Sequence, residues 1–284
     1  MNALKADPAG SFIQAADGLQ IFTRRWDAAQ SKAACVVIHG LGEHSGRYEA
    51  LAHDLTGRGF SVWVLDLRGH GRSQGRRGDC RSVGEYTADM DLLMDKVREA
   101  TPTLPRILIG HSLGGLLTLR YAVEHPEKIK AVAVSSPALR LALKLPKIKV
   151  ALAECLDRVA PLTPIPNGVN PRLLSHNPEV VQRYRSDPLV DRVITARCAI
   201  LLREAMRESS ALAARLRIPC LILQAGNDAI CDADAAGEFA EAAPQRLIEF
   251  RRYDGLYHEI FNEPERDRVI DDLCRWMEKV LGGA

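Results

Sequence analysis

The stretch from Pro105 to Glu124 constrains the fold more than any other part of the sequence. It begins with an apolar run, 107–109, that is typical of a strand buried on both faces, and it becomes helical in period from Leu113. Between the two lies Gly-His-Ser-Leu-Gly at 110–114, with a glycine on either side of Ser112. This pattern predicts a sharp strand-to-helix turn, an elbow that lifts the Ser112 hydroxyl clear of the sheet. Ser112 is therefore predicted to be a nucleophile, although a plain packing turn would use the same glycines.

A second segment, Gly-Arg-Ser-Gln-Gly at 71–75, matches the same pattern around Ser73. No helix-period segment follows it, because the next residues are Arg-Arg-Gly-Asp. An elbow needs a strand before the serine and a helix after it, so Ser73 is interpreted as a loop serine.

Alternating apolar runs and helical segments predict the fold class. After a hairpin turn at Asp17-Gly18, buried strands are expected at 34–38, 61–65, 107–109, 131–134, 219–223 and 247–250. Helical periods lie between most of them, and a last helix is expected at 265–281. Such alternation is typical of an α/β protein with a mostly parallel sheet and helices on both faces.

The alternation stops between Ala138 and Leu216, where helical pieces are separated by prolines and no strand is evident. This segment is too long for a plain loop, so we predict a helical cap, 138–216, inserted into a core formed by 1–137 and 217–284. Its first part, 139–150, mixes apolar residues with four cations and no acid. Two interpretations remain open: a lid resting on a lipid surface, and an amphipathic helix packed on the core with its lysines reaching to solvent.

Composition limits the remaining possibilities. With 284 residues, 46% of them hydrophobic, the chain is long enough for one large core plus a small subdomain. A net charge of +2 gives no indication of nucleic acid or of an acidic partner. The seven cysteines include no C-x-x-C pair, which favours free thiols in a reducing compartment over disulfides or a zinc site. Without a recognisable signal peptide or membrane-spanning stretch, the protein is expected to be soluble and cytoplasmic.

A serine hydroxyl needs a histidine to take its proton and a carboxylate to hold that histidine in the right tautomer. In an open parallel sheet such groups gather at the carboxyl ends of strands. Asp228 follows the strand expected at 219–223, and His258 follows the one expected at 247–250. Serine, acid, histidine is also the chain order that this elbow requires. Ser112, Asp228 and His258 are therefore the predicted catalytic residues.

Other acids and histidines are less well placed. Asp232 and Asp234 lie later in the acid loop or at the next helix start, where a helix-capping role suffices. Asp66 also ends a strand, but it precedes the elbow and is expected to brace the loop behind it. His39 and His111 lie in tight glycine turns and are expected to be structural. The others have no strand-end placement that singles them out: His44, His53, His70, His125 and His176.

The oxyanion that forms during ester cleavage needs two preorganised donors. By the elbow geometry one is the backbone N–H of Leu113. The second should come from the loop after an early strand, and the glycine-rich segment 39–42 is the candidate there, with the backbone N–H of Leu41 as donor. A simple turn would also account for these glycines.

Five segments together resemble a known family. They are the oxyanion segment at 39–48, the Asp-x-x-Gly-His-Gly-x-Ser loop at 66–73, the elbow at 110–115, Tyr-Arg-Ser-Asp-Pro-Leu at 184–189 and the acid loop at 224–232. In these segments the chain is similar to the monoacylglycerol lipase and lysophospholipase group of α/β-hydrolases, often labelled serine aminopeptidase-like.

The resemblance implies an α/β-hydrolase fold and hydrolysis of carboxyl esters of single-chain lipids, with the cap forming an acyl tunnel. It also implies that Glu43, Arg47 and Tyr184 lie near a polar pocket for the alcohol. One position departs from the group. Three residues after His258, where the vertebrate lipase carries a second histidine, this chain has Phe261, which favours a broader esterase specificity.

The sequence as a whole predicts a serine ester hydrolase that needs no cofactor or metal. Monoacylglycerol is the leading substrate, followed by lysophospholipids and short-chain aryl esters. The expected partners are a small lipid or ester substrate and a transient membrane surface at the cap, which would make the cytoplasmic protein peripheral there. An alternative of another class is a non-catalytic ligand-binding protein on the same fold, although such a protein has no need of all three catalytic groups.

Overall fold

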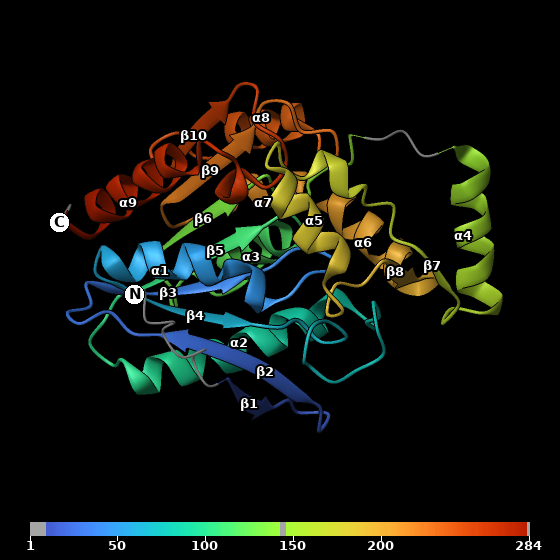
Figure 1. The fold of residues 1–284 in the computed structure, drawn as a ribbon, viewed down its shortest axis with the longest axis horizontal. Helices are drawn as coiled ribbons and strands as arrows, with labels where there is room; N and C mark the ends of the chain where they lie inside the picture. The colour runs from blue at the N-terminus through green and yellow to red at the C-terminus, as the bar shows by residue number, and fades with distance from the viewer. Residues whose placement is uncertain (1–9, 143–145, 283–284) are drawn as a thin grey trace.

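The computed structural model describes residues 10–142 and 146–282. Its centre is an eight-stranded sheet in the order β1-β2-β4-β3-β5-β6-β9-β10 (Figure 1). From β4 to β10 all neighbouring strands are parallel, whereas β1 and β2 form an antiparallel hairpin at one edge. The strands are β1 (Ser11–Gln14), β2 (Gln20–Trp26), β3 (Ala33–Ile38), β4 (Phe60–Leu65), β5 (Arg106–His111), β6 (Ala131–Ser135), β9 (Cys220–Ala225) and β10 (Ile248–Tyr253). The predicted mostly parallel sheet is confirmed.

Each face of the sheet carries its own hydrophobic core. Residues of β3 alternate between the two: Val36 and Ile38 join one core, and Cys35 and Val37 join the other. Because both faces are covered, the central strands are continuously apolar, as the sequence indicated. The first core is closed by α2 (Val83–Ala100), α3 (Leu113–Glu124) and α8 (Ala233–Ala242), and the second by α1 (Glu49–Gly57) and α9 (Arg266–Gly282).

Residues between β6 and β9 form an additional helical segment (Figure 1). It contains α4 (Lys147–Val159), α5 (Pro178–Ser186), α6 (Ala196–Glu208) and α7 (Ser210–Ala213). The expectation that it holds no strand is wrong, because β7 (Pro164–Pro166) pairs with β8 (Val193–Thr195) in an antiparallel ribbon. Three-residue strands, one of them bounded by prolines, are too short to produce a period in the sequence. Residues 143–145 of the basic apolar stretch lie outside the described residues. Among the described residues, no helix combines the length and apolarity that crossing a bilayer requires.

The strand register aligns the ends of β3, β4 and β5. Ile38 at the end of β3 pairs with Leu65 of β4 on one side and with Gly110 of β5 on the other. The loops that follow these three strands therefore start side by side at the carboxyl edge of the sheet. α3 packs directly over this edge because Gly114 lies against the end of β3, where an added Cβ would come 2.1 Å from the Ile38 carbonyl oxygen.

This close approach predicts opposite effects for two glycine-to-alanine changes in helices. Gly114→Ala should lower the free energy of unfolding by about 1–3 kcal/mol, because the added methyl group clashes with backbone that cannot move aside. Gly237→Ala in α8 meets no atom within 4 Å and should stabilise by about 0.5–1 kcal/mol through helix propensity. Urea unfolding of both variants measures the difference. An unchanged midpoint for Gly114→Ala would contradict the packing.

Candidate active site

Ser112 lies at the junction of β5 and α3 in a strained backbone conformation. Its φ is +53°, in the region that residues other than glycine rarely adopt. The flanking glycines make the turn possible, since a Cβ on Gly110 would come 2.4 Å from the Gly114 carbonyl oxygen. The Ser112 backbone is held on both sides, with its N–H donating to Ser135 O at 3.0 Å and its carbonyl accepting from Ala138 N at 2.9 Å. The structure thus has the predicted strand–turn–helix geometry at this serine.

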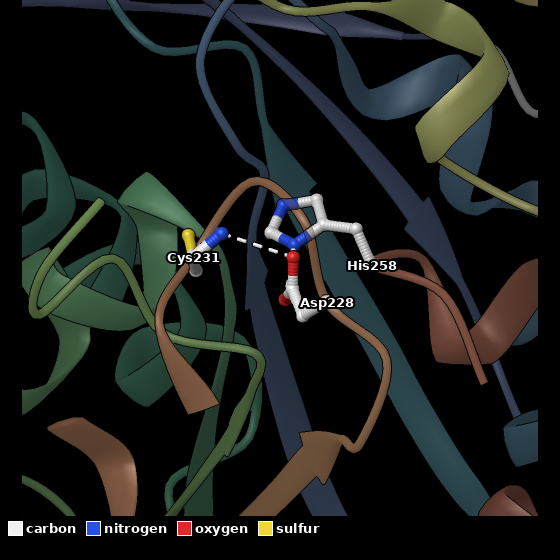
Figure 2. A group of neighbouring side chains, drawn as sticks. All are labelled: Asp228, Cys231 and His258. Carbon is white, nitrogen blue, oxygen red and sulfur yellow. Dashed lines mark hydrogen bonds and ion pairs between the residues drawn. The ribbon is translucent and has the colours of Figure 1, made fainter. Parts of the chain in front are cut away.

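Asp228 and His258 come together from the loops after β9 and β10. Nδ1 of His258 lies 2.7 Å from Oδ2 of Asp228, and both side chains are almost completely buried. The other carboxylate oxygen, Oδ1, accepts the backbone N–H groups of Ile230 and Cys231, each at 2.9 Å. Figure 2 shows Cys231 beside the Asp228–His258 pair. An ionised carboxylate held in this way fixes the proton of His258 on Nδ1 and leaves Nε2 as the basic nitrogen.

Burial and charge act in opposite directions on this pair. Burial disfavours protonated His258, but the charge and hydrogen bond of Asp228 outweigh it, so the pKa of His258 is raised above 6.5. Burial likewise opposes ionisation of Asp228, yet His258 and the two backbone N–H groups lower its pKa below 3.8. The pair is therefore arranged to stabilise an imidazolium when one forms.

Cys231 connects this pair to the serine, and no sequence pattern pointed to it. Its N–H binds Asp228, while its buried thiol lies 3.9 Å from Ser112 Oγ. Ser112, Asp228 and His258 therefore belong to one site. Single ligand atoms of Asp228, Cys231 and His258 also lie within 4.8 Å of one another, a spacing open to a metal ion. The chemistry fits poorly, because burial and the charge of Asp228 raise the pKa of the Cys231 thiol well above 9.0 and metals bind the thiolate.

The oxyanion segment, 39–48, is called the oxyanion loop from here on, and its glycine-rich start lies next to the elbow. A Cβ on Gly40 would come 3.1 Å from the Cβ of Ser112. Nε2 of His39 accepts the N–H of Leu67 at 2.9 Å, so Nδ1 carries the proton and donates to Gly40 O at 2.7 Å. A planar trans peptide points its N–H opposite to its C=O, so this bond also orients the N–H of Leu41. The expectation that His39 is structural agrees with these bonds, and the donor role of the Leu41 and Leu113 N–H groups stays a prediction.

The three predicted pocket residues lie together. They also contact Glu259, which the sequence did not indicate. Arg47 Nε donates to Glu43 at 3.0 Å, and the Arg47 guanidinium lies 4.7 Å from the ring centre of Tyr184. Arg47 also donates to both oxygens of Glu259, each at 2.6 Å. Glu259 follows His258 directly, and this adjacency is the one signal that could have marked it. Phe261 is buried beside this group.

The rival residues have structural partners. Asp66 accepts the backbone N–H groups of Ser45 and Arg72 at 2.6 and 2.7 Å, which is the bracing role expected of it. Ser73 is buried, accepts the N–H of Phe22 and donates to Asp66 O. Asp232 caps α8 by accepting the N–H of Asp234, in agreement with the capping interpretation.

Known proteins share the fold and about a third of the sequence. The family model of serine aminopeptidase, S33, matches residues 29–265. A monoacylglycerol lipase of Mycolicibacterium smegmatis is 34% identical over 265 residues, covering 92% of this chain and 93% of that protein. A phospholipase of Bacillus subtilis is 32% identical over 247 residues, covering 86% and 95%. The crystal structure of a monoacylglycerol lipase from Paleococcus ferrophilus has a TM-score of 0.84 at 35% identity and covers 93% of this chain and 99% of that one.

The acid loop follows β9, and the loop after β10 that carries His258 is called the histidine loop. A parallel sheet that carries a serine elbow, an acid loop and a histidine loop in this order defines an α/β-hydrolase. Within that class, the chain belongs to the serine aminopeptidase S33 family. Both the fold class and the family resemblance inferred from the sequence are thereby confirmed.

The elbow geometry predicts different outcomes for the two candidate serines. Ser112→Ala should abolish ester hydrolysis and covalent labelling by a fluorophosphonate probe. Ser73→Ala should keep the labelling and lower the melting temperature instead, because it removes two buried hydrogen bonds, each worth about 1 kcal/mol. Mass spectrometry of the labelled peptide locates the probe, and labelling that persists in Ser112→Ala would contradict the assignment.

The raised pKa of His258 predicts the pH dependence of activity. Only neutral His258 accepts the serine proton, so kcat/KM should rise with pH through a midpoint above 6.5 and then level off. Asp228→Asn removes the group that raises this pKa, so the midpoint should move to lower pH while kcat falls by ~10⁴-fold, as it does in other Ser-His-Asp hydrolases. Initial rates between pH 5 and 9 test both effects. A midpoint unmoved in Asp228→Asn would remove Asp228 as the partner of the base.

Proposed function

We propose that this protein is a serine ester hydrolase that cleaves monoacylglycerol. The observation that carries this proposal is the buried Asp228–His258 pair, joined at 2.7 Å and connected through Cys231 to a serine in an elbow. Relatives that cover nearly the whole chain, among them the mycobacterial monoacylglycerol lipase, support the substrate class.

In the proposed mechanism Ser112 Oγ attacks the ester carbonyl carbon while Nε2 of His258 takes the hydroxyl proton. Asp228 stabilises the imidazolium, and the N–H groups of Leu41 and Leu113 bind the oxyanion. His258 then gives the proton to the departing alcohol oxygen, which leaves the acyl group on Ser112. A water molecule, deprotonated by His258, repeats the sequence and releases the fatty acid. Each proton moves between groups of this chain and the substrate, so no cofactor enters the balance.

Phe261 bears on which alcohol group the substrate carries. Phe261 is buried beside Glu43 and Arg47 and has no group that could hydrogen-bond a particular alcohol, so a broader range of esters is proposed. The Bacillus phospholipase relative makes a lysophospholipid the second candidate substrate. A ligand-binding protein without catalysis is the alternative of another class, and the buried acid–histidine pair argues against it because binding alone does not need it.

The helical segment 138–216 is proposed to be a cap over the acyl chain, with α4 as its contact to a lipid surface. Three apolar side chains of α4 are exposed: Ile148 by 78%, Leu152 by 58% and Val159 by 74%. An amphipathic helix packed on the core would bury such residues, so their exposure favours the lid interpretation over the packed helix. The protein would then attach to a membrane peripherally, through this helix.

A panel of esters tests the proposal. Monoacylglycerols, lysophospholipids and aryl esters of graded chain length should all depend on Ser112, with monoacylglycerol preferred. Affinity should rise about threefold to fourfold per methylene, from about 0.8 kcal/mol each, until the acyl site is full. Wild-type protein that binds these lipids without turnover would support the ligand-binding alternative.

The same panel tests the lipid contact of α4. Ile148→Glu should slow hydrolysis of long-chain monoacylglycerol in vesicles or micelles, because it places a charge on the surface that meets lipid. The variant should cleave a soluble short-chain aryl ester at the wild-type rate. Glu179, exposed on α5, offers a control: Glu179→Gln should change neither rate. Equal losses on both substrates would indicate damage to folding rather than to a lipid contact.

A further inference from the structure

Arg47 is buried between two carboxylates, one from its own segment and one from the loop after β10. The Arg47 side chain is 8% exposed, and those of Glu43 and Glu259 are 6% and 3% exposed. Its Nε binds Glu43 at 3.0 Å, and its Nη2 binds both oxygens of Glu259 at 2.6 Å. Two carboxylates taken out of water would repel each other strongly, so this arrangement depends on the guanidinium between them.

Glu43 belongs to the oxyanion loop and holds its backbone. Its Oε1 accepts the N–H of Gly40 at 2.6 Å and the hydroxyl of Tyr48 at 2.7 Å. Burial would raise the pKa of Glu43, but His111, Arg47 and the hydrogen bond of Tyr48 lower it to about 2. Glu43 therefore stays ionised, and its position sets that of the Gly40 backbone, one residue before the predicted Leu41 donor.

Glu259 belongs to the histidine loop and fixes the residue after His258. Besides Arg47, its side chain binds Asn262 Nδ2 at 2.9 Å, and its backbone N–H donates to Leu174 O of the helical segment at 2.8 Å. Arg47 thus connects the loop of the proposed oxyanion donor to the loop of the proposed base.

The space around these groups leaves little room for an alcohol. The cavity that they line, together with His111 and Phe261, has a volume of about 10 Å³, room for about one water molecule. A glycerol moiety does not fit there. Arg47 is also covered by the ring of Tyr184, 4.7 Å away. The contacts of Arg47 are with the protein's own loops.

We propose that Arg47 is a positioning residue that clamps the oxyanion loop to the histidine loop through Glu43 and Glu259, rather than a ligand of the substrate alcohol. This rests on the proposed function, because the clamp matters only if both loops act on the same ester.

The clamp also affects the charge near His258, since Glu259 and Glu43 both favour the protonated form of His258. The ionisable groups around His258 are Asp228 and Cys231 of the acid loop, His111 at the end of β5, Glu43 and Arg47 of the oxyanion loop, and Glu259 beside it.

Glu259→Gln tests the electrostatic part with little change of shape. Removing one negative charge near His258 should move the midpoint of kcat/KM to lower pH. NMR titration of the His258 ring should show the same movement without any substrate. Glu265→Gln, an exposed carboxylate on the same loop, is the matched control and should leave both midpoints in place. A His258 titration that is identical in Glu259→Gln and wild type would overturn the proposal.

Arg47→Met tests the positioning part. Because a misplaced oxyanion donor affects every ester, kcat should fall by at least about tenfold for monoacylglycerol and for a soluble aryl ester alike, with little change in KM. Arg47→Lys keeps the charge and should recover part of the lost kcat. A raised KM for monoacylglycerol alone, with the aryl ester unaffected, would make Arg47 an alcohol ligand and overturn the clamp.

The two hypotheses fail separately. If wild-type protein cleaves no ester and no probe labels Ser112, the proposed function is wrong, while the His258 titration still decides the electrostatic part of the clamp. If wild type is active and Arg47→Met and Glu259→Gln match it in kcat and midpoint, only the clamp is wrong. Should Arg47→Met not fold, as judged by its melting temperature, Glu259→Gln decides alone.

Discussion

The contact of Gly114 with the end of β3 is the constraint on which the rest of the site depends. Because no side chain separates them, α3 starts almost on top of the Ile38 and His39 carbonyls. That contact sets where Ser112 can lie, and it brings the serine within van der Waals distance of the loop that begins at Gly40. A single methyl group at Gly114 would separate the proposed nucleophile, Ser112, from the loop proposed to bind the oxyanion. The strain at Ser112, with φ at +53°, is stabilised by the hydrogen bonds of its own backbone on both sides.

Two of the buried ion pairs around this centre join different loops. Asp228 of the loop after β9 binds His258 of the loop after β10, and Arg47 binds Glu259 across 212 residues while also binding Glu43 within its own segment. Pairing buried charges offsets their desolvation without adding much net stability, so these pairs are poor explanations of why the protein folds. They do restrict the fold to one arrangement of the loops, since breaking any pair would leave a charge unpaired away from water.

Much of this arrangement was predictable because it follows from local pattern and strand order. The elbow around Ser112 is a local signal, and the places of Asp228 and His258 follow from the rule that functional loops succeed parallel strands. The contacts of Cys231 and Glu259 were not predictable in the same way. Arg47 and Glu259 are 212 residues apart, and nothing in either segment indicates that they meet. The β7–β8 ribbon was missed for a different reason, because three residues produce no period.

The helical segment between β6 and β9 combines two kinds of packing, and the difference bears on how substrate can reach Ser112. The part around α5 is fixed to the oxyanion loop, because Asp187 binds His44 Nε2 at 2.9 Å and the N–H of Asp191 donates to Gly42 O at 2.8 Å. Displacing that part would pull on the segment that holds the proposed Leu41 donor. α4 instead packs on α6 and leaves Ile148 and Leu152 exposed, and among the described residues no hydrogen bond joins it to the segment 39–42. The hydrogen bonds of the described residues therefore tie α5, and not α4, to the segment proposed to bind the oxyanion.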